Sequence, residues 1–271
     1  MIRTMTTTVV LLAALATGVE AQRAVAVATS PAETVAVVPF GPGEKFVYRV
    51  TYGILGKRGT ATSEISGIET LRGQRTYHLN FRLEGCALWA CIDDRQESWL
   101  DVGQLFSHRF RQDLNQPRYK RLRTLDFFPA ERVWRQLEKP DNTGELATDR
   151  PLDDVSFLYW SRTLPLEVGR TYTFNRYYKD EGNPVRVQVL RRERVTVPAG
   201  TFNTIVVRPL IRTDGMFSEG GEAEVYYTDD ARRLIVLVKT SMAIGKLQMQ
   251  LESYEPGTKL PATRTGGPVR P

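Results

Sequence analysis

Histidine and cysteine are scarce in this chain, and their scarcity restricts the chemistry that it can perform. Among 271 residues there are two histidines and two cysteines. The sequence contains no His-x-His or His-Glu-x-x-His pattern, no Gly-x-Ser-x-Gly elbow, no phosphate loop and no dinucleotide fingerprint. We therefore expect no metal ion, no cofactor and no Ser-His-Asp hydrolase. Polysaccharide cleavage by a pair of carboxylates stays open.

Long apolar runs are also lacking. The strongest run, residues 9–16, is far shorter than the roughly 20 apolar residues that a membrane-spanning helix needs. It follows Arg3 and precedes the small residues Val19 and Ala21, which is the pattern of a cleaved signal peptide over residues 1–21. We expect export to the periplasm and no transmembrane segment in the mature chain.

Cys86 and Cys91 are the two cysteines, and four residues separate them in the setting of a hairpin tip. In an oxidising compartment such a pair closes a local disulfide. The spacing differs from Cys-x-x-Cys and no histidine is nearby, which argues against a redox or metal site. We expect the bond to stiffen the tip more than it stabilises the fold, because the closed loop is small.

Alternation of apolar and polar residues with a period of two dominates the chain. Tyr77, Leu79 and Phe81 alternate with His78 and Asn80, as in a half-buried strand. Short turns rich in Gly, Pro and Asp separate the strands. The sequence predicts a mainly β fold, an antiparallel curved sheet or an open or closed barrel-like fold. Further runs of this kind lie at residues 46–52, 172–178, 185–189, 202–207, 223–227, 234–238 and 246–254.

One segment, near residues 152–163, has helical spacing, with Asp153 or Asp154 as N-cap and Pro165 beyond its end. These two carboxylates could form an acid/base dyad. Adjacent side chains point in different directions, however, and capping explains one of them. We predict one short helix packed on the sheet, preceded by a polar hairpin loop or linker at residues 139–148.

These features predict a single β-rich domain over residues 39–255. A flexible segment, residues 22–38, would precede it. A disordered tail, residues 256–271, would follow it, since that stretch holds four prolines and three glycines.

Several short motifs follow one another at a characteristic spacing between about residues 40 and 255. The motifs are Phe40-Gly41-Pro42-Gly43-Glu44, Asp153-Asp154-Val155-Ser156-Phe157-Leu158-Tyr159, Val195-Thr196-Val197-Pro198-Ala199-Gly200-Thr201-Phe202 and Tyr227-Thr228-Asp229-Asp230. They resemble those of the bacterial family catalogued as domain of unknown function 3108. The resemblance implies export and a mostly β fold, and it assigns no catalytic residues. In place of the family's usual small Ser-Ala pair in the helix, this chain has Phe157-Leu158.

The densest positive charge lies at residues 108–123. Here Arg109, Arg111, Tyr119 and Arg121 are candidate binding residues for an anionic lipid or an acidic envelope polysaccharide. A solvated, arginine-rich sheet face is the alternative interpretation. We expect no nucleic acid as partner, because an exported protein seldom meets one. Moreover, half of the net charge of +6 lies in the expected tail.

Three further polar residues invite a structural interpretation. His78 falls on the polar face of its strand, so we expect it to be exposed. His108 lies between Phe106 and Phe110, so we expect it to be partly buried and hydrogen-bonded. Glu44 precedes a strand, where a solvated position is the commoner case and a buried carboxylate paired with arginine is the alternative.

Taken together, these patterns favour a monomeric, non-enzymatic binding or carrier protein of the envelope, with a lipid or glycan ligand. A carboxylate-dependent envelope glycan hydrolase and a structural partner of an envelope complex are the alternatives. An apolar cavity without converging carboxylates would favour binding. Two carboxylates about 5 to 10 Å apart in a cleft would favour hydrolysis, and a flat apolar patch would favour a structural partner.

Overall fold

A single antiparallel sheet of 14 strands makes up most of the fold. The computed structural model describes residues 38–52, 57–87, 90–117, 119–211, 223–242 and 245–260. Within these ranges, one α-helix, α1 (Asp154–Ser161), and two short 3-10 helices, η1 (Pro129–Glu131) and η2 (Asp180–Gly182), accompany the sheet. The strands are β1 (Lys45–Tyr52), β2 (Lys57–Leu71), β3 (Gln74–Ala87), β4 (Ala90–Asp101), β5 (Ser107–Gln116), β6 (Tyr119–Phe128), β7 (Val133–Gln136), β8 (Lys139–Glu145), β9 (Thr171–Phe174), β10 (Val185–Val197), β11 (Gly200–Leu210), β12 (Glu224–Thr228), β13 (Ile235–Met242) and β14 (Gly245–Glu255).

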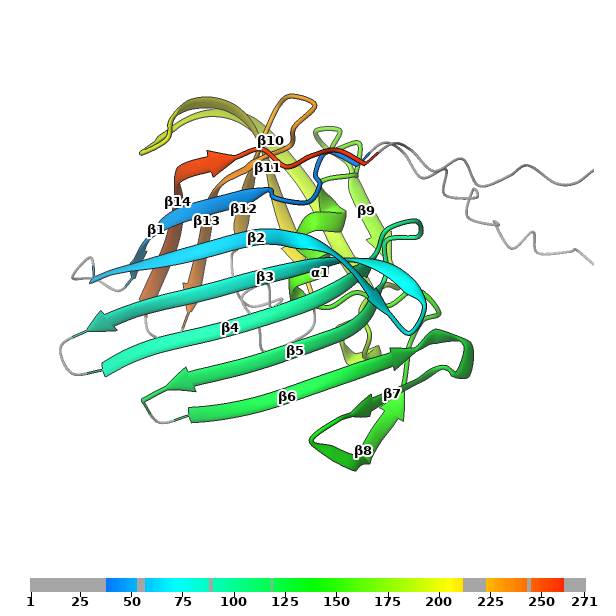
Figure 1. Ribbon diagram of the computed structural model, residues 1–271. Coiled ribbons are helices and arrows are strands. Elements are labelled where there is room, and N and C mark those ends of the chain that lie inside the picture. Colours follow the sequence, from blue (N-terminus) through cyan, green and yellow to red (C-terminus); the bar gives the residue numbers. More distant parts are fainter. Residues whose placement is uncertain are drawn as a thin grey trace, which may run out of the picture. The chain divides into compact units, whose positions relative to one another are not determined.

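The strand order shows how the sheet is assembled. Each strand pairs with its neighbours in sequence, except that β8 and β9 do not pair with each other, and β1 also pairs with β14, which joins the two halves of the chain. The ladder ends at β8 on one side and β9 on the other, and a short parallel bridge joins Leu152 to Tyr177. The sheet curls around α1 (Figure 1). The predicted mainly β fold with a curved antiparallel sheet and one helix is confirmed, and the sheet is open.

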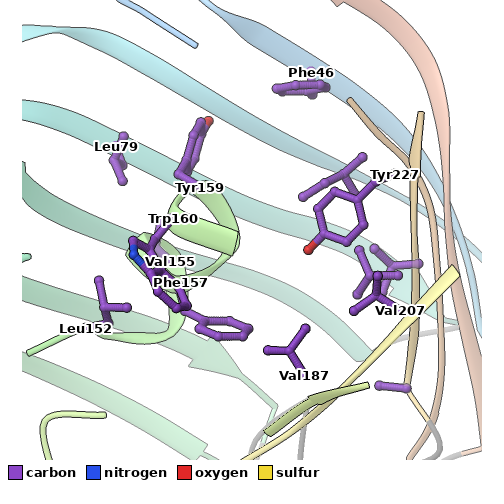
Figure 2. Close-up of a cluster of buried hydrophobic side chains, with 14 of the residues drawn as sticks. Phe46, Leu79, Leu152, Val155, Phe157, Tyr159, Trp160, Val187, Val207 and Tyr227 are labelled. Carbon is purple, nitrogen blue, oxygen red and sulfur yellow. The ribbon is translucent and has the colours of Figure 1, made fainter. Parts of the chain in front are cut away.

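The core lies between α1 and the concave side of the sheet, which we call the inner face. Strand alternation places Tyr77 and Leu79 on this face, and both are buried. Their register partners on β4, Leu100 and Ser98, lie on the same face. Figure 2 shows side chains of α1 among those of the surrounding strands.

Helix α1 begins at a capping box. The Asp153 carboxylate accepts hydrogen bonds from the backbone N–H groups of Val155 and Ser156, and the Ser156 hydroxyl bonds the Asp153 N–H in return. Most residues of α1 are buried, including Phe157 and Trp160, because the sheet curls around the helix. The predicted helix is confirmed, with Asp153 as its cap.

The predicted loop or linker at residues 139–148 is wrong for its first part, because Lys139–Glu145 form strand β8. This strand lies at the edge of the sheet and pairs with β7 alone. An edge strand needs no apolar alternation when both faces are solvated, and it tolerates Pro140. Six of its seven residues are exposed, so its polar composition matches its position.

Order extends past the expected end of the domain at residue 255. The backbone N–H of Thr258 donates to the Pro42 carbonyl at 2.8 Å, and Leu260 packs against the core. A side chain at Gly41 would collide with the Thr258 backbone, which explains the glycine there. The remaining predicted tail, residues 261–271, lies outside the described residues, as do the predicted signal peptide and nearly all of the segment 22–38. No helix in the described ranges has the length and apolar character that crossing a bilayer requires.

The predicted disulfide is confirmed. Cys86 and Cys91 are register partners at the end of β3 and the start of β4, and their sulfur atoms are bonded. Their Cα atoms lie 4.0 Å apart, so the bond closes a small loop at the hairpin tip.

Replacing Cys86 and Cys91 together with serine is expected to lower the free energy of unfolding by about 2 kcal/mol or less, because a short loop removes little unfolded-state entropy. Urea denaturation followed by far-ultraviolet circular dichroism measures the change. Loss of cooperative unfolding in the double variant would contradict a local role for the bond.

Candidate functional site

A narrow apolar cavity lies between α1 and the inner face of the sheet. About 20 Å³ of it is open to the centre of a water molecule, which is room for about one water. Its walls come from α1 and from β1, β2, β3, β13 and β14, and none of the lining side chains is a carboxylate. The lining residues are Phe46, Tyr48, Ser63, Phe81, Leu158, Tyr159, Arg162, Ile235, Val238 and Met249.

Arg162, one of the residues that line this cavity, forms a buried ion pair with Glu44. Two nitrogens of the guanidinium donate to the two carboxylate oxygens at 2.6 and 2.9 Å, and both side chains are almost fully buried. Tyr254 donates a further hydrogen bond to Glu44 at 3.0 Å, and Arg162 also donates to the Arg232 carbonyl at 3.1 Å. Burial disfavours the charged form of Arg162, but Glu44 outweighs burial and raises its pKa.

Glu44 is therefore buried, and its expected position at a solvated strand start is wrong. The alternative, a buried carboxylate paired with arginine, is the arrangement found. Three aromatic rings also surround the Arg162 guanidinium, with centroids 5.4 to 5.7 Å from its central carbon. Contact with the negative faces of aromatic rings adds attraction for a desolvated cation. These rings belong to Phe40, Phe46 and Tyr159.

The tyrosine hydroxyls around the cavity have partners of their own. Tyr48 donates to the Ile235 carbonyl at 3.0 Å, and the hydroxyls of Tyr159 and Ser63 lie 3.0 Å apart. Because these polar tips are hydrogen-bonded, the surface that the tyrosines offer to the cavity is mainly their apolar rings.

The carboxylates of Asp153 and Asp154 have different hydrogen-bond partners. Asp153 accepts a hydrogen bond from Ser98 at 2.6 Å besides its capping bonds, and burial raises its pKa to about 6. Asp154 instead accepts a hydrogen bond from Tyr177 at 3.2 Å, and burial also raises its pKa. Each carboxylate has its own donors, so the geometry does not support an acid/base dyad.

The four predicted binding residues do not share a face of the sheet. The register of β5 and β6 places Arg109 and Arg111 on the outer face, and Arg121 and Tyr119 on the inner face. Arg109 is paired with Asp126, with one of its two contacts at 2.9 Å, and Arg111 is paired with Glu97.

Nor do the two inner residues lie beside the cavity. Tyr119 is 46% exposed, and its hydroxyl accepts a hydrogen bond from Arg121 at 3.3 Å. The predicted strip is thus split between two faces, and its two outer arginines are already neutralised by carboxylates.

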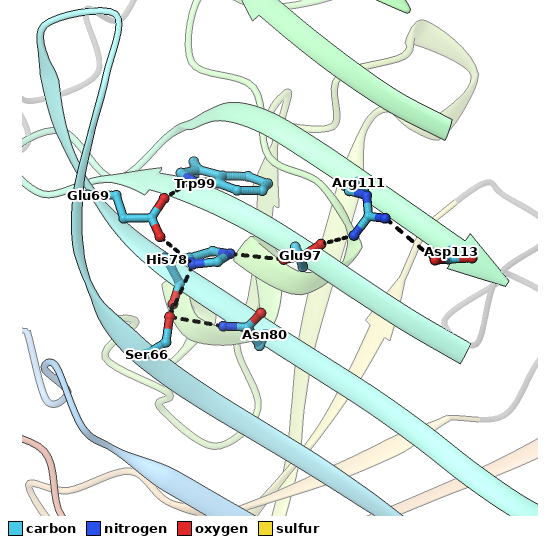
Figure 3. Close-up of polar contacts among 8 residues, drawn as sticks. All are labelled: Ser66, Glu69, His78, Asn80, Glu97, Trp99, Arg111 and Asp113. Carbon is cyan, nitrogen blue, oxygen red and sulfur yellow. Dashed lines mark hydrogen bonds and ion pairs between the residues drawn. The ribbon is translucent and has the colours of Figure 1, made fainter. Parts of the chain in front are cut away.

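On the outer face, His78 lies in a polar network (Figure 3). Its Nδ1 is 2.8 Å from Glu69 and its Nε2 is 3.2 Å from Glu97, while its ring stacks on Trp99 with centroids 4.5 Å apart. Its side chain is 14% exposed, so the expectation of an exposed histidine is wrong. The expectation for His108 is confirmed, because this residue is buried and hydrogen-bonded to Asp101 at 3.0 Å.

Sequence reasoning missed Arg162 and the partners of His78. Arg162 follows the helix as its C-cap, and no local pattern reveals that its partner lies 118 residues away. Within the ranges that the structure describes, no group of three or more His, Cys, Asp or Glu residues could hold a metal ion.

The fold defines a class of barrel-like β protein in which an open sheet encloses one helix. The family model described as "Protein of unknown function (DUF3108)" matches residues 47–252, so the chain belongs to this family. No curated protein matches the chain at a significant level of sequence similarity.

Among solved structures, the chain is similar to a β-barrel-like protein of domain of unknown function DUF1849 from Brucella abortus. The TM-score is 0.54 and the identity 12%, over 82% of this chain and 100% of that one, which shows the fold alone. A weaker likeness is to a Bacteroides fragilis protein described as exported and with a YmcC-like fold, with a TM-score of 0.34 and 11% identity over 81% of this chain and 98% of that one. Another is to a protein from Parabacteroides distasonis described as a lipoprotein, with a TM-score of 0.33 and 11% identity over 81% of this chain and 99% of that one.

Replacing Arg162 with Met keeps an apolar stem but leaves the Glu44 carboxylate buried without a cation. We expect the free energy of unfolding to fall by about 3–5 kcal/mol. Adding Glu44→Gln removes the buried charge and is expected to recover part of the loss. Urea denaturation of the single and double variants measures both effects.

The matched control is Arg49→Met, because Arg49 forms a solvent-exposed pair with Glu252 across β1 and β14. This variant is expected to lose less than about 1 kcal/mol of unfolding free energy. Equal losses for Arg49→Met and Arg162→Met would show that burial gives the Arg162–Glu44 pair no special role.

The His78 network predicts a pH-dependent stability. Burial lowers the pKa of His78, but the hydrogen bond to Glu97 and the charge of Glu69 outweigh it, so the pKa lies above its ordinary value. A raised folded-state pKa stabilises the fold below the unfolded-state pKa, and this stabilisation is lost as pH rises through the folded-state pKa.

His78→Phe keeps a ring against Trp99 but removes the charge. We expect its loss of unfolding free energy, relative to the unchanged protein, to be larger near about pH 6 than near about pH 8.5. Urea denaturation at both values measures it, and an equal loss would contradict the assigned ion pairs.

Proposed function

We propose that this chain is a non-enzymatic binding protein that holds an apolar, chain-like ligand, such as the acyl chain of a lipid, against its inner face. The observation that carries the proposal is the cavity beside α1, which is lined largely by apolar and aromatic side chains and by no carboxylate. Ligand sites in proteins are mostly apolar, with a few polar groups that fix orientation.

Partly exposed apolar side chains extend this surface beyond the cavity. Phe81 and Leu158 line the cavity yet remain partly exposed, and Leu83 follows Phe81 on the inner face of β3. The cavity itself has room for about one water. The greater part of a ligand would therefore lie along these side chains, with the cavity receiving its end.

The disulfide supports an extracytoplasmic location, which we propose to be the periplasm. Disulfides persist in oxidising compartments and are rare in the cytosol. The bond between Cys86 and Cys91 is consistent with the exported start that the sequence of residues 1–21 predicts.

The two alternative functions have less support. A glycan hydrolase would need two carboxylates that converge on a cleft, whereas Asp153 is used in capping and Asp154 is bonded to Tyr177. A structural partner would present a contiguous apolar patch. The large apolar residues that are exposed in the described ranges lie instead on separate segments: Tyr119 and Leu122 point to opposite faces of β6, Leu137 lies between β7 and β8, and Val168 lies before β9.

Binding of 1-decanol, followed by isothermal titration calorimetry, tests the proposal with an uncharged ten-carbon chain. We expect saturable binding to the unchanged protein and at least about tenfold weaker binding to Leu158→Asn, because the variant places an amide against the chain. Leu122→Asn is the matched control, since Leu122 is 51% exposed on the outer face of β6.

Absence of decanol binding to the unchanged protein would overturn the proposal, and so would equal weakening by both variants. Native mass spectrometry of the protein purified from its own periplasm provides a second measurement. A co-purifying lipid mass supports the proposal, and a ligand-free mass at high yield counts against it.

A further inference from the structure

We propose that the inner face also holds an anionic head group at Arg123, so that the ligand is an amphiphile with an acidic head and an apolar chain. The inference rests on the proposed binding function and adds the chemistry of the head. Arg123 lies on β6, on the same face of the sheet as the cavity.

A continuous row of register partners connects the cavity to Arg123. Pairing across β2 to β6 runs from Ser63 to Phe81, then to Gln96, Gln112 and Arg123. Register partners share a face, so all five belong to the inner face. The first two line the cavity, and Arg123 lies three strands beyond Phe81, about 14 Å away at the usual strand spacing.

The polar part of this row has unsatisfied atoms. Gln96 Oε1 and Arg123 Nε are buried and have no hydrogen-bond partner in the described structure, and the same holds for Trp160 Nε1 and Arg162 Nε away from this row. A buried polar atom without a partner is costly, and native proteins contain few of them. A ligand head group at this position would supply an acceptor for Arg123.

No carboxylate within the described ranges forms an ion pair with Arg123, in contrast to Arg109, Arg111 and Arg162. The Nη2 of Arg123 donates to Gln112 and, at 3.4 Å, to the Tyr178 hydroxyl, which are both neutral. The Nε–H group of Arg123 has no acceptor, and a single oxygen of a carboxylate or a phosphate would supply one.

Asp154 lies near Arg123 but leaves it available. Its carboxylate is bonded to Tyr177, and the charge of Arg123 lowers its pKa while burial raises it more strongly. The negative charge of Asp154 is therefore expected to weaken the binding of an anion at Arg123, but Asp154 does not itself take the place of that anion.

Calorimetric titration with decanoate, decyl phosphate and 1-decanol separates the head from the chain. We expect at least one of the two anions to bind the unchanged protein about tenfold more tightly than decanol. Arg123→Gln is expected to abolish this preference and to leave decanol binding unchanged. The anion that binds more tightly distinguishes a carboxylate head from a phosphate head.

Lys120→Gln is the matched control, because it removes one positive charge from the outer face of the same strand. It is expected to leave all three affinities unchanged. Asp154→Asn provides a second test, which does not depend on whether Arg123→Gln folds stably. Removal of the negative charge of Asp154 is expected to tighten the binding of both anions and to leave the affinity for decanol unchanged.

An anion preference that persists in Arg123→Gln would overturn the inference, as would an unchanged anion affinity in Asp154→Asn. If decanol binds and neither anion binds more tightly, the head-group inference alone fails. If no ligand binds, the proposed function fails.

Discussion

The buried pair of Arg162 and Glu44 is the interaction on which the arrangement of helix and sheet depends. It connects the end of α1 to the residue before β1, to Tyr254 on β14 and to the turn before β13. Desolvation of two charges is expensive, and Coulomb attraction repays it only in good geometry. The two-pronged contact and the surrounding aromatic rings meet that condition, and they tie the end of α1 to one position on the sheet.

The helix is attached to the sheet at its other end as well. Asp153 joins the start of α1 to Ser98 on β4, and Ser156 joins it to Ser107 on β5. The apolar cavity, which Leu158 lines, lies between a helix held at both ends and the strands that face it.

Local patterns in the sequence predicted the elements that local physics controls. Alternation predicted the strands, capping residues predicted α1, and the spacing of Cys86 and Cys91 predicted the disulfide. Long-range partners could not be predicted in this way, since Glu44 and Arg162 are far apart in sequence and His78 takes its partners from two other strands. The division of the basic strip has a related cause: Arg111 and Arg121 lie on opposite faces because of the register of β5 and β6, which the sequence leaves undetermined without the geometry of the turn.

The inner face departs from its own pattern at the row that leads away from the cavity. A strand face that covers a core is expected to be apolar, yet Gln96, Gln112 and Arg123 occupy three consecutive partner positions there. Polar side chains on such a face reduce stability unless they are fully hydrogen-bonded, and Gln96 Oε1 and Arg123 Nε are not. Natural sequences keep such local conflicts mainly where function requires them. An acidic head group supplies acceptors and so leaves Gln96 Oε1 without a donor. The unpartnered Arg123 Nε is the atom of this row that such a ligand explains better than the folding of the sheet does.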